Sequence, residues 1–156
     1  MAEVERQYRV TRSAVDALLR GVEDGTAGLP GDVTPRAVRS LLGAVPGEPA
    51  PKAGGQLDAT FVVQLFAVFE TACRRCWTEY IGSSRERLAV QALLRRLRDR
   101  SRGLIDAGSL AEADRVREAR NGIVHGGDRT SQMDFVDAKQ RLGRFLGGLP
   151  QEWVMP

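Results

Sequence analysis

A chain of 156 residues with 42% apolar and 28% charged residues is long enough to form one globular domain with a buried core. No apolar run approaches the roughly 20 residues of a membrane span, and the first residues lack a signal peptide's apolar stretch, so we expect a cytoplasmic protein outside any membrane. The net charge of +3 and pI of 9.3 permit a modest affinity for polyanions such as RNA, because 20 carboxylates offset 23 cations.

Nearly all of the cationic side chains are arginines, and only two are lysines. A guanidinium group binds phosphate through two parallel hydrogen bonds, so this bias suits contact with RNA. GC-rich coding explains the same bias without any functional role. The composition therefore permits RNA binding and does not establish it.

The amino-terminal part of the chain, residues 1–45, predicts two helices. Apolar side chains recur at three- and four-residue spacing over residues 3–24, which is the pattern of an amphipathic helix. Glycines and Pro30 end this helix. Thr34 and Pro35 can then begin a short second helix, with the proline at its first position.

Residues 46–57 separate this part from the expected core bundle at residues 58–149. Over residues 46–55 no apolar side chain is larger than alanine, which predicts a mobile loop. Residues 58–81 are the most apolar segment and predict a central helix buried by several neighbours. We expect the two parts to form a single domain over residues 1–156.

Two features interrupt the apolar pattern of this central helix. Glu70 lies on its apolar face, and a buried carboxylate needs a partner. It either supports a functional site by pairing with an arginine there, or it faces solvent or an oligomer partner. Cys73 and Cys76 lack a second pair of ligands for zinc, so we interpret both as small core residues and expect no metal site and no cofactor.

The next segment combines an apolar face with a dense row of arginines. Ser83-Ser84-Arg85-Glu86 has the pattern of a capping box, which predicts a helix that continues to about residue 105. Its inner side is expected to comprise Leu88, Val90, Ala92, Leu93, Leu97, Leu104 and Ile105. Its outer side comprises Arg85, Arg87, Arg95, Arg96, Arg98, Arg100 and Arg102. Such a face is either solvated surface or a track for the phosphates of a nucleic acid.

Residues 118–127 contain the only histidine of the chain. Ser109-Leu110-Ala111-Glu112 is a second capping-box pattern, so the helix that carries this stretch should span about residues 110–125. Gly126 or Gly127 can supply the left-handed residue that closes it, with His125 in the last turn. Helical spacing places Asn121 and His125 on one face, with Arg117 one turn earlier.

Gly122 lies inside this predicted helix, where glycine costs about 1 kcal/mol relative to alanine. Its presence suggests that another helix or a ligand approaches closely.

A last helix is expected to begin after a cap at Thr130 or Ser131 and to end at Gly147-Gly148. Its inner stripe comprises Phe135, Ala138, Leu142, Phe145 and Leu146. The apolar tail at residues 153–155 should dock on the body of the protein. About five helical patterns, short connections and no alternating strand pattern predict an all-α, up-and-down helical bundle.

The spacing of Arg120-Asn121, three further residues and His125 resembles the Arg-(four to six residues)-His motif of HEPN domains, in which a polar residue often follows the arginine. The resemblance extends over residues 58–149. HEPN proteins are small, all-helical and usually dimeric, and many are metal-independent ribonucleases of toxin-antitoxin, phage-defence and RNA-processing systems. The resemblance implies a homodimer that cuts RNA, with an antitoxin or a sensor protein as a further partner. Gly127 stands where some HEPN toxins have a tyrosine, so a regulatory modification of that tyrosine is not expected here.

This resemblance implies roles for the motif residues. His125 would be the general acid or base at the ribose 2′-hydroxyl or the leaving 5′-oxygen. Arg120 would hold the phosphate, and Asn121 would orient the imidazole or donate to the substrate. The expected substrate-binding residues are Arg117, Arg95, Arg98 and Arg102.

Two other interpretations use the same residues. One is a HEPN-like or unrelated helical adaptor that binds a partner, an effector or RNA without cutting it. The other is a dimerising helical scaffold whose arginines are ordinary surface residues.

Overall fold

The computed structural model describes residues 1–43, 55–81, 88–126 and 133–153, and within these ranges it is helical without any strand. The all-α prediction is therefore confirmed for this part of the chain. The helices are α1 (Ala2–Glu23), α2 (Pro35–Leu41), α3 (Gln56–Cys76), α4 (Val90–Arg100), α5 (Ala107–His125) and α6 (Phe135–Gly147). A π-helical turn, η1 (Trp77–Ile81), extends α3, and a 3-10 turn, η3 (Gln151–Trp153), follows α6.

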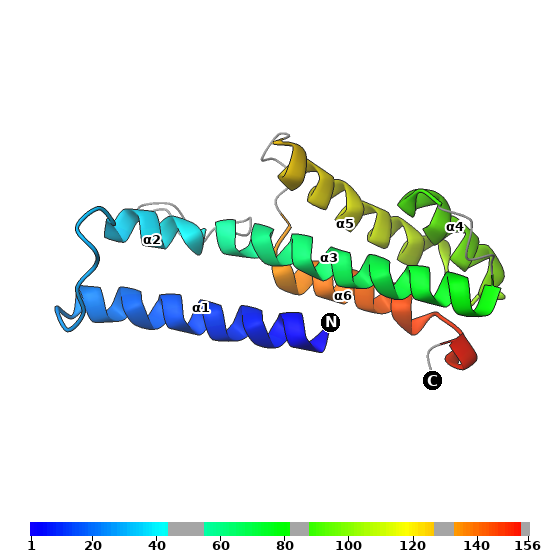
Figure 1. The fold of residues 1–156 in the computed structure, drawn as a ribbon, viewed down its shortest axis with the longest axis horizontal. Helices are drawn as coiled ribbons and strands as arrows, with labels where there is room; N and C mark the ends of the chain where they lie inside the picture. The colour runs from blue at the N-terminus through cyan, green and yellow to red at the C-terminus, as the bar shows by residue number, and fades with distance from the viewer. Residues whose placement is uncertain (44–54, 82–87, 127–132, 154–156) are drawn as a thin grey trace.

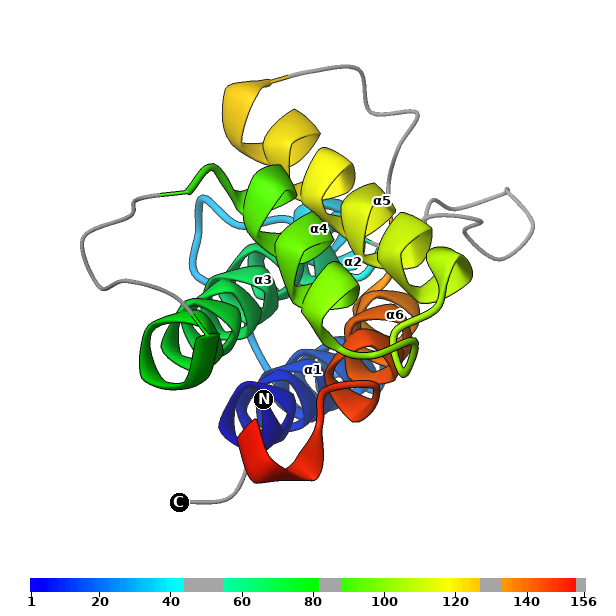
Figure 2. The same cartoon turned by 90° about the vertical axis from the view of Figure 1, so that its right-hand side faces the viewer.

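Helices α3 to α6 pack together as a bundle, and α1 and α2 add an arm to it (Figure 1). The amino-terminal half of α1 lies beside α3 and α6, whereas its carboxyl-terminal half pairs with α2 beyond the end of the bundle. Figure 2 looks along the long axis and shows α3, α4, α5 and α6 around a common interior. The two amino-terminal helices predicted from the sequence are thus present, and only the first half of α1 belongs to the bundle.

Large apolar side chains from α3, α4, α5 and α6 fill this interior. The fully buried ones include Leu65, Phe66, Phe69, Leu93, Leu94, Leu97, Val116, Phe135, Leu142 and Phe145. Cys73 and Cys76 are also buried and form no disulfide, and burial raises the pKa of the Cys73 thiol. Both cysteines are therefore core residues, as expected. Trp153 packs against the same core, and its carbonyl oxygen lies 3.5 Å from the Cys76 Sγ.

A single buried carboxylate joins α1, α3 and α6. The Asp58 residue is only 3% exposed, and its Oδ1 accepts hydrogen bonds from the Tyr8 hydroxyl at 2.8 Å and the Phe135 backbone N–H at 3.1 Å. Its Oδ2 accepts from the Gly55 N–H at 3.2 Å and lies 3.8 Å from the Arg12 guanidinium. The Tyr8 and Phe135 rings stack with their centroids 4.1 Å apart. This junction fixes where α3 and α6 begin and which part of α1 they hold.

Two helix starts differ from the sequence prediction. The N-cap of α5 is Asp106, whose Oδ1 accepts from the Ser109 N–H at 2.5 Å, so Ser109 lies inside the helix and the cap predicted there is wrong. The N-cap of α6 is Asp134, which accepts from the Asp137 N–H at 2.7 Å. The expected caps Thr130 and Ser131 lie outside the described residues. Aspartate and serine are about equally favourable at an N-cap. The local sequence therefore does not decide between Asp106 and Ser109, which are three residues apart.

Helix α4 is shorter than expected. It begins at Val90, and the capping-box pattern at residues 83–86 lies outside the described residues. It ends at Arg100, so Leu104 is 62% exposed rather than on the inner side, while Ile105 is buried. Helix α3 begins at Gln56, two residues before the expected start, and residues 46–54 of the expected loop lie outside the description.

We predict that Asp58→Ala lowers the free energy of unfolding by about 3 kcal/mol, because it leaves the buried donors of Tyr8, Gly55 and Phe135 without an acceptor. Urea denaturation followed by circular dichroism measures this change. Asp99→Ala, which removes an exposed aspartate of α4, is the matched control and should change stability little. Equal effects of the two substitutions would contradict the role assigned to the junction.

A second pair of variants tests how closely the turn after α4 packs on α6. A Cβ atom at Gly148 would lie 2.7 Å from the Leu104 carbonyl oxygen and 2.9 Å from Ile105 Cγ1, whereas one at Gly147 would meet nothing within 4 Å. Gly148→Ala should therefore cost about 1–3 kcal/mol, and Gly147→Ala should be neutral or slightly stabilising. Thermal unfolding compares the two, and a Gly148→Ala protein as stable as the parent would show that the turn is packed loosely.

Candidate active site at the end of helix α5

Helix α5 is held along its first two thirds and projects at its carboxyl end. Ala113, Val116 and Ala119 are buried against the bundle. Beyond them the side chains become more accessible, until Val124 is 49% exposed and His125 is also exposed. Figures 1 and 2 both show the last turns of α5 rising away from α3 and α6. The predicted motif therefore occupies an exposed helix end.

Gly126 ends this helix and is one of the two glycines that the sequence offered for this position. Its φ of 67° and ψ of 24° place it in the left-handed region, and its N–H donates to the Gly122 carbonyl oxygen. Glycine adopts this conformation without the steric cost that a Cβ atom brings. His125 is consequently the last residue of α5, beside carbonyl groups that have no partner within the helix.

The structure brings two of the three motif residues into direct contact. The Arg120 Nη1 donates to the Asn121 Oδ1 at 3.0 Å, and both side chains are half-buried. Asn121 thereby orients the guanidinium, while its own amide N–H groups can still donate. His125 lies one turn later, and its imidazole makes no hydrogen bond or ion pair with any described residue.

Gly122 lies between these residues, on an open part of the helix surface. A Cβ atom built at this position would meet nothing within 4 Å among the described residues. The close approach that the sequence suggested is thus not made by any residue that the structure describes. A ligand or another molecule has room to approach the helix there.

Arg117 is engaged by carboxylates and is less available to a substrate than the sequence suggested. Its Nε lies 2.6 Å from the Asp114 Oδ1, and its Nη2 lies 3.6 Å from the Glu118 Oε1. Burial acts to raise the pKa of the Asp114 carboxyl, but hydrogen bonds from Arg117 and Gln91 and the charges of Arg117 and Arg95 outweigh it, so this pKa is lowered. Gln91 and Asp114 also link α4 to α5. Arg117 therefore pairs with the carboxylate that accepts the hydrogen bond from Gln91 of α4.

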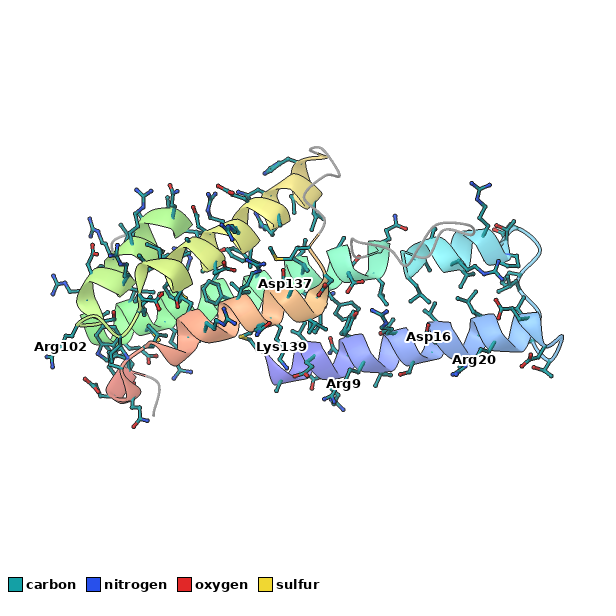
Figure 3. All side chains as sticks on the ribbon, turned by 180° about the vertical axis from the view of Figure 1, so that it is seen from behind. Arg9, Asp16, Arg20, Arg102, Asp137 and Lys139 are labelled. Carbon is teal, nitrogen blue, oxygen red and sulfur yellow. The ribbon has the colours of Figure 1, made fainter. Side chains whose placement is uncertain are left out.

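The other expected substrate-binding arginines lie away from the motif. Arg95, Arg98 and Arg102 are exposed, and Arg102 lies in the turn after α4 with a φ of 55° rather than on the helix. This turn immediately precedes the amino end of α5, whereas His125 is the last residue of that helix. Because α5 has 19 residues, the two ends are about 28 Å apart. Figure 3 shows Arg102 at the far end of the bundle.

Glu70 does not pair with a motif arginine. Its Oε1 lies 2.6 Å from the Nη2 of Arg74, one turn later on α3, and Arg74 also donates to the Leu88 carbonyl oxygen. The carboxylate thus helps to hold the segment before α4 against α3, because one guanidinium contacts both elements. The sequence pattern did not indicate the contact between Arg74 and Leu88, because such patterns report on neighbours a few residues apart and Leu88 lies 18 residues after Glu70.

Two further findings bear on the kinds of chemistry that the described residues can support. No group of three or more histidine, cysteine, aspartate or glutamate side chains among them is arranged to hold a metal ion. None of the described helices combines the length and the apolar character needed to cross a membrane.

Comparison of the chain with models of known families, with curated proteins and with solved structures finds no match. The residues best placed for chemistry are at the accessible end of α5, which carries Arg120, Asn121 and His125 on consecutive turns.

Proposed function

We propose that this protein is a HEPN-type endoribonuclease that cleaves RNA without a metal ion. The proposal is supported by one observation above all, which is that Arg120 and Asn121 touch each other one turn before an exposed His125. A proton-transfer group and a phosphate-binding cation are thus offered to solvent on the same helix end. Both are needed to cleave a phosphodiester through the neighbouring hydroxyl group.

In the proposed reaction the ribose 2′-oxygen attacks the adjacent phosphorus atom and the bond to the 5′-oxygen breaks. The products are a 2′,3′-cyclic phosphate and a free 5′-hydroxyl. His125 takes the proton from the 2′-hydroxyl or gives one to the leaving 5′-oxygen. Arg120, oriented by Asn121, binds the phosphate oxygens as negative charge builds on them.

A single histidine does not readily serve as base and acid in the same step. The proposal therefore includes a homodimer that brings two copies of the α5 end into one cleft, where one imidazole accepts a proton and the other donates one. The open surface at Gly122 and the half-exposed Val124 leave room for a second copy. The biological setting we propose is a toxin-antitoxin or phage-defence system in the cytoplasm, with an antitoxin or sensor protein as regulator.

A second candidate function is a helical adaptor that binds a partner or RNA without cutting it. A groove between α1 and α2 favours this candidate, because it lies on the arm, away from the end of α5. It is lined by Ser13, Asp16, Leu19, Arg20, Glu23, Arg39 and Leu42. Its lining offers a protein partner both ion-pairing groups and the apolar side chains of Leu19 and Leu42.

We predict that His125→Ala and Arg120→Ala each reduce RNA cleavage by at least about 100-fold, because each removes a group that acts in the transition state. Helical content and thermal unfolding should stay nearly unchanged, since neither side chain is buried. Arg115→Ala, which removes an exposed arginine of the same helix, is the control and should retain activity. Undiminished cleavage by both purified motif variants would falsify the catalytic assignment.

The products and the cofactor requirement give an independent test. We expect fragments that end in a 2′,3′-cyclic phosphate, an unchanged rate in excess EDTA, and no cleavage of DNA of the same sequence, which lacks the 2′-hydroxyl. Mass spectrometry of an RNA digest identifies the ends. Loss of activity in EDTA, or fragments with 5′-phosphate ends, would contradict the mechanism, and RNA binding without any fragments would favour the adaptor.

A further inference from the structure

The net positive charge of this protein is concentrated in one short segment. Residues 95–106 contain five arginines and two aspartates, which gives a formal charge of +3, and the whole chain also has a formal charge of +3. The remaining residues therefore balance to zero. An anionic partner is therefore attracted to this segment more strongly than to the rest of the chain taken together.

Three of these five arginines differ from many of the others because no neighbouring carboxylate among the described residues pairs with them. Elsewhere, ion pairs with carboxylates engage Arg6, Arg39, Arg74, Arg75, Arg115, Arg117 and Arg141. The guanidinium groups of Arg98, Arg100 and Arg102 make no ion pair or hydrogen bond with any described residue. Arg9, Arg20 and Arg36 are unpaired in the same sense but are spread along the arm.

Arg98, Arg100 and Arg102 lie together, and we call them the arginine end. The first two are in the last turn of α4, and Arg102 follows two residues later in the turn that leads to α5. Close contact between Gly148 and the backbone of Leu104 and Ile105 holds this turn against the end of α6. The three cations are thus presented from a packed part of the bundle, and Figure 3 shows Arg102 pointing outward from it.

We propose that the arginine end binds the backbone of an RNA strand whose cleavage site lies at His125, so that the substrate has to span the length of α5. This inference rests on the proposed function. Guanidinium groups bind phosphate oxygens in pairs, and unpaired guanidinium groups have no competing carboxylate to displace. At about 3.4 Å per stacked nucleotide, the 28 Å or so between the two ends corresponds to about eight nucleotides.

The chemistry of this surface fits RNA better than an acidic protein. Leu104 is the one large exposed apolar side chain in the turn among the described residues. Protein interfaces need apolar or aromatic anchors at their centre, whereas a strand of RNA offers regularly spaced phosphates. Substrates shorter than the span of α5 should therefore be bound and cut without help from the arginine end.

Binding can be tested apart from cleavage with a fluorescent 24-nucleotide 2′-O-methyl RNA, which cannot react through its 2′-oxygen. The test variant combines Arg98→Gln, Arg100→Gln and Arg102→Asn, because asparagine tolerates the positive φ at position 102. The control combines Arg6→Gln, Arg9→Gln and Arg36→Gln and removes the same charge from exposed positions of α1 and α2. We expect the test variant to bind the RNA at least about tenfold more weakly. The slope of its log binding constant against log salt concentration should also be smaller in magnitude by about 2. The control should remain within about threefold of the parent.

Two results of this binding experiment would overturn the inference. Equal losses in the test and control variants would show that only the total charge matters. Competition by polyglutamate as strong as that by unlabelled RNA of equal charge would indicate an acidic protein as the partner.

Cleavage of unmodified RNA separates this inference from the proposed function. For a 24-nucleotide substrate the test variant should raise KM at least about tenfold and leave kcat unchanged, and for a tetranucleotide it should change neither. A protein that binds through the arginine end but cuts no RNA would refute the nuclease proposal alone. A protein that cuts RNA while the test variant binds and cuts as the parent does would refute the arginine end alone.

Discussion

The buried carboxylate of Asp58 is the interaction on which the arrangement of the helices depends. A charge taken out of water is tolerated only when hydrogen-bond donors replace the lost solvent, so Tyr8, Gly55 and the start of α6 have to meet at this point. Because α1 is anchored through Tyr8, near its amino end, its carboxyl half is left to extend with α2 as an arm. The hydrogen bond from the Phe135 N–H to Asp58 places the start of α6 at the end of the bundle from which α5 projects.

The two ends of α5 differ in how many contacts they make with the other helices. Near its amino end, Glu112 pairs with Arg141 of α6, and Asp114 receives a hydrogen bond from Gln91 of α4. After Ala119 the partly buried Ile123 still packs against the core, and beyond it the side chains of Val124 and His125 are exposed. A helix that is fixed at one end and exposed at the other presents its last side chains in a defined direction, with solvent on most sides.

The proposed reaction makes use of this exposure and also explains why one chain is not enough for it. Arg120 is already oriented by Asn121, so the phosphate-binding group is prepared before substrate arrives. His125 has no such support from the described residues and needs a second proton-transfer group. An exposed helix end can provide that group by meeting its counterpart in another copy, whereas a motif buried in the bundle could not.

The sequence by itself determined the helical segments, the all-α class and the end of α5 at one of two adjacent glycines, because periodicity and helix stop signals act between residues a few positions apart. It predicted a cap at Ser109, whereas α5 begins three residues earlier, at the Asp106 cap. It also gave no sign that Asp58 joins three helices, or that Arg102 lies a full helix length from the motif. These features were decided by the tertiary structure, since they depend on which buried groups find hydrogen-bond partners from distant parts of the chain.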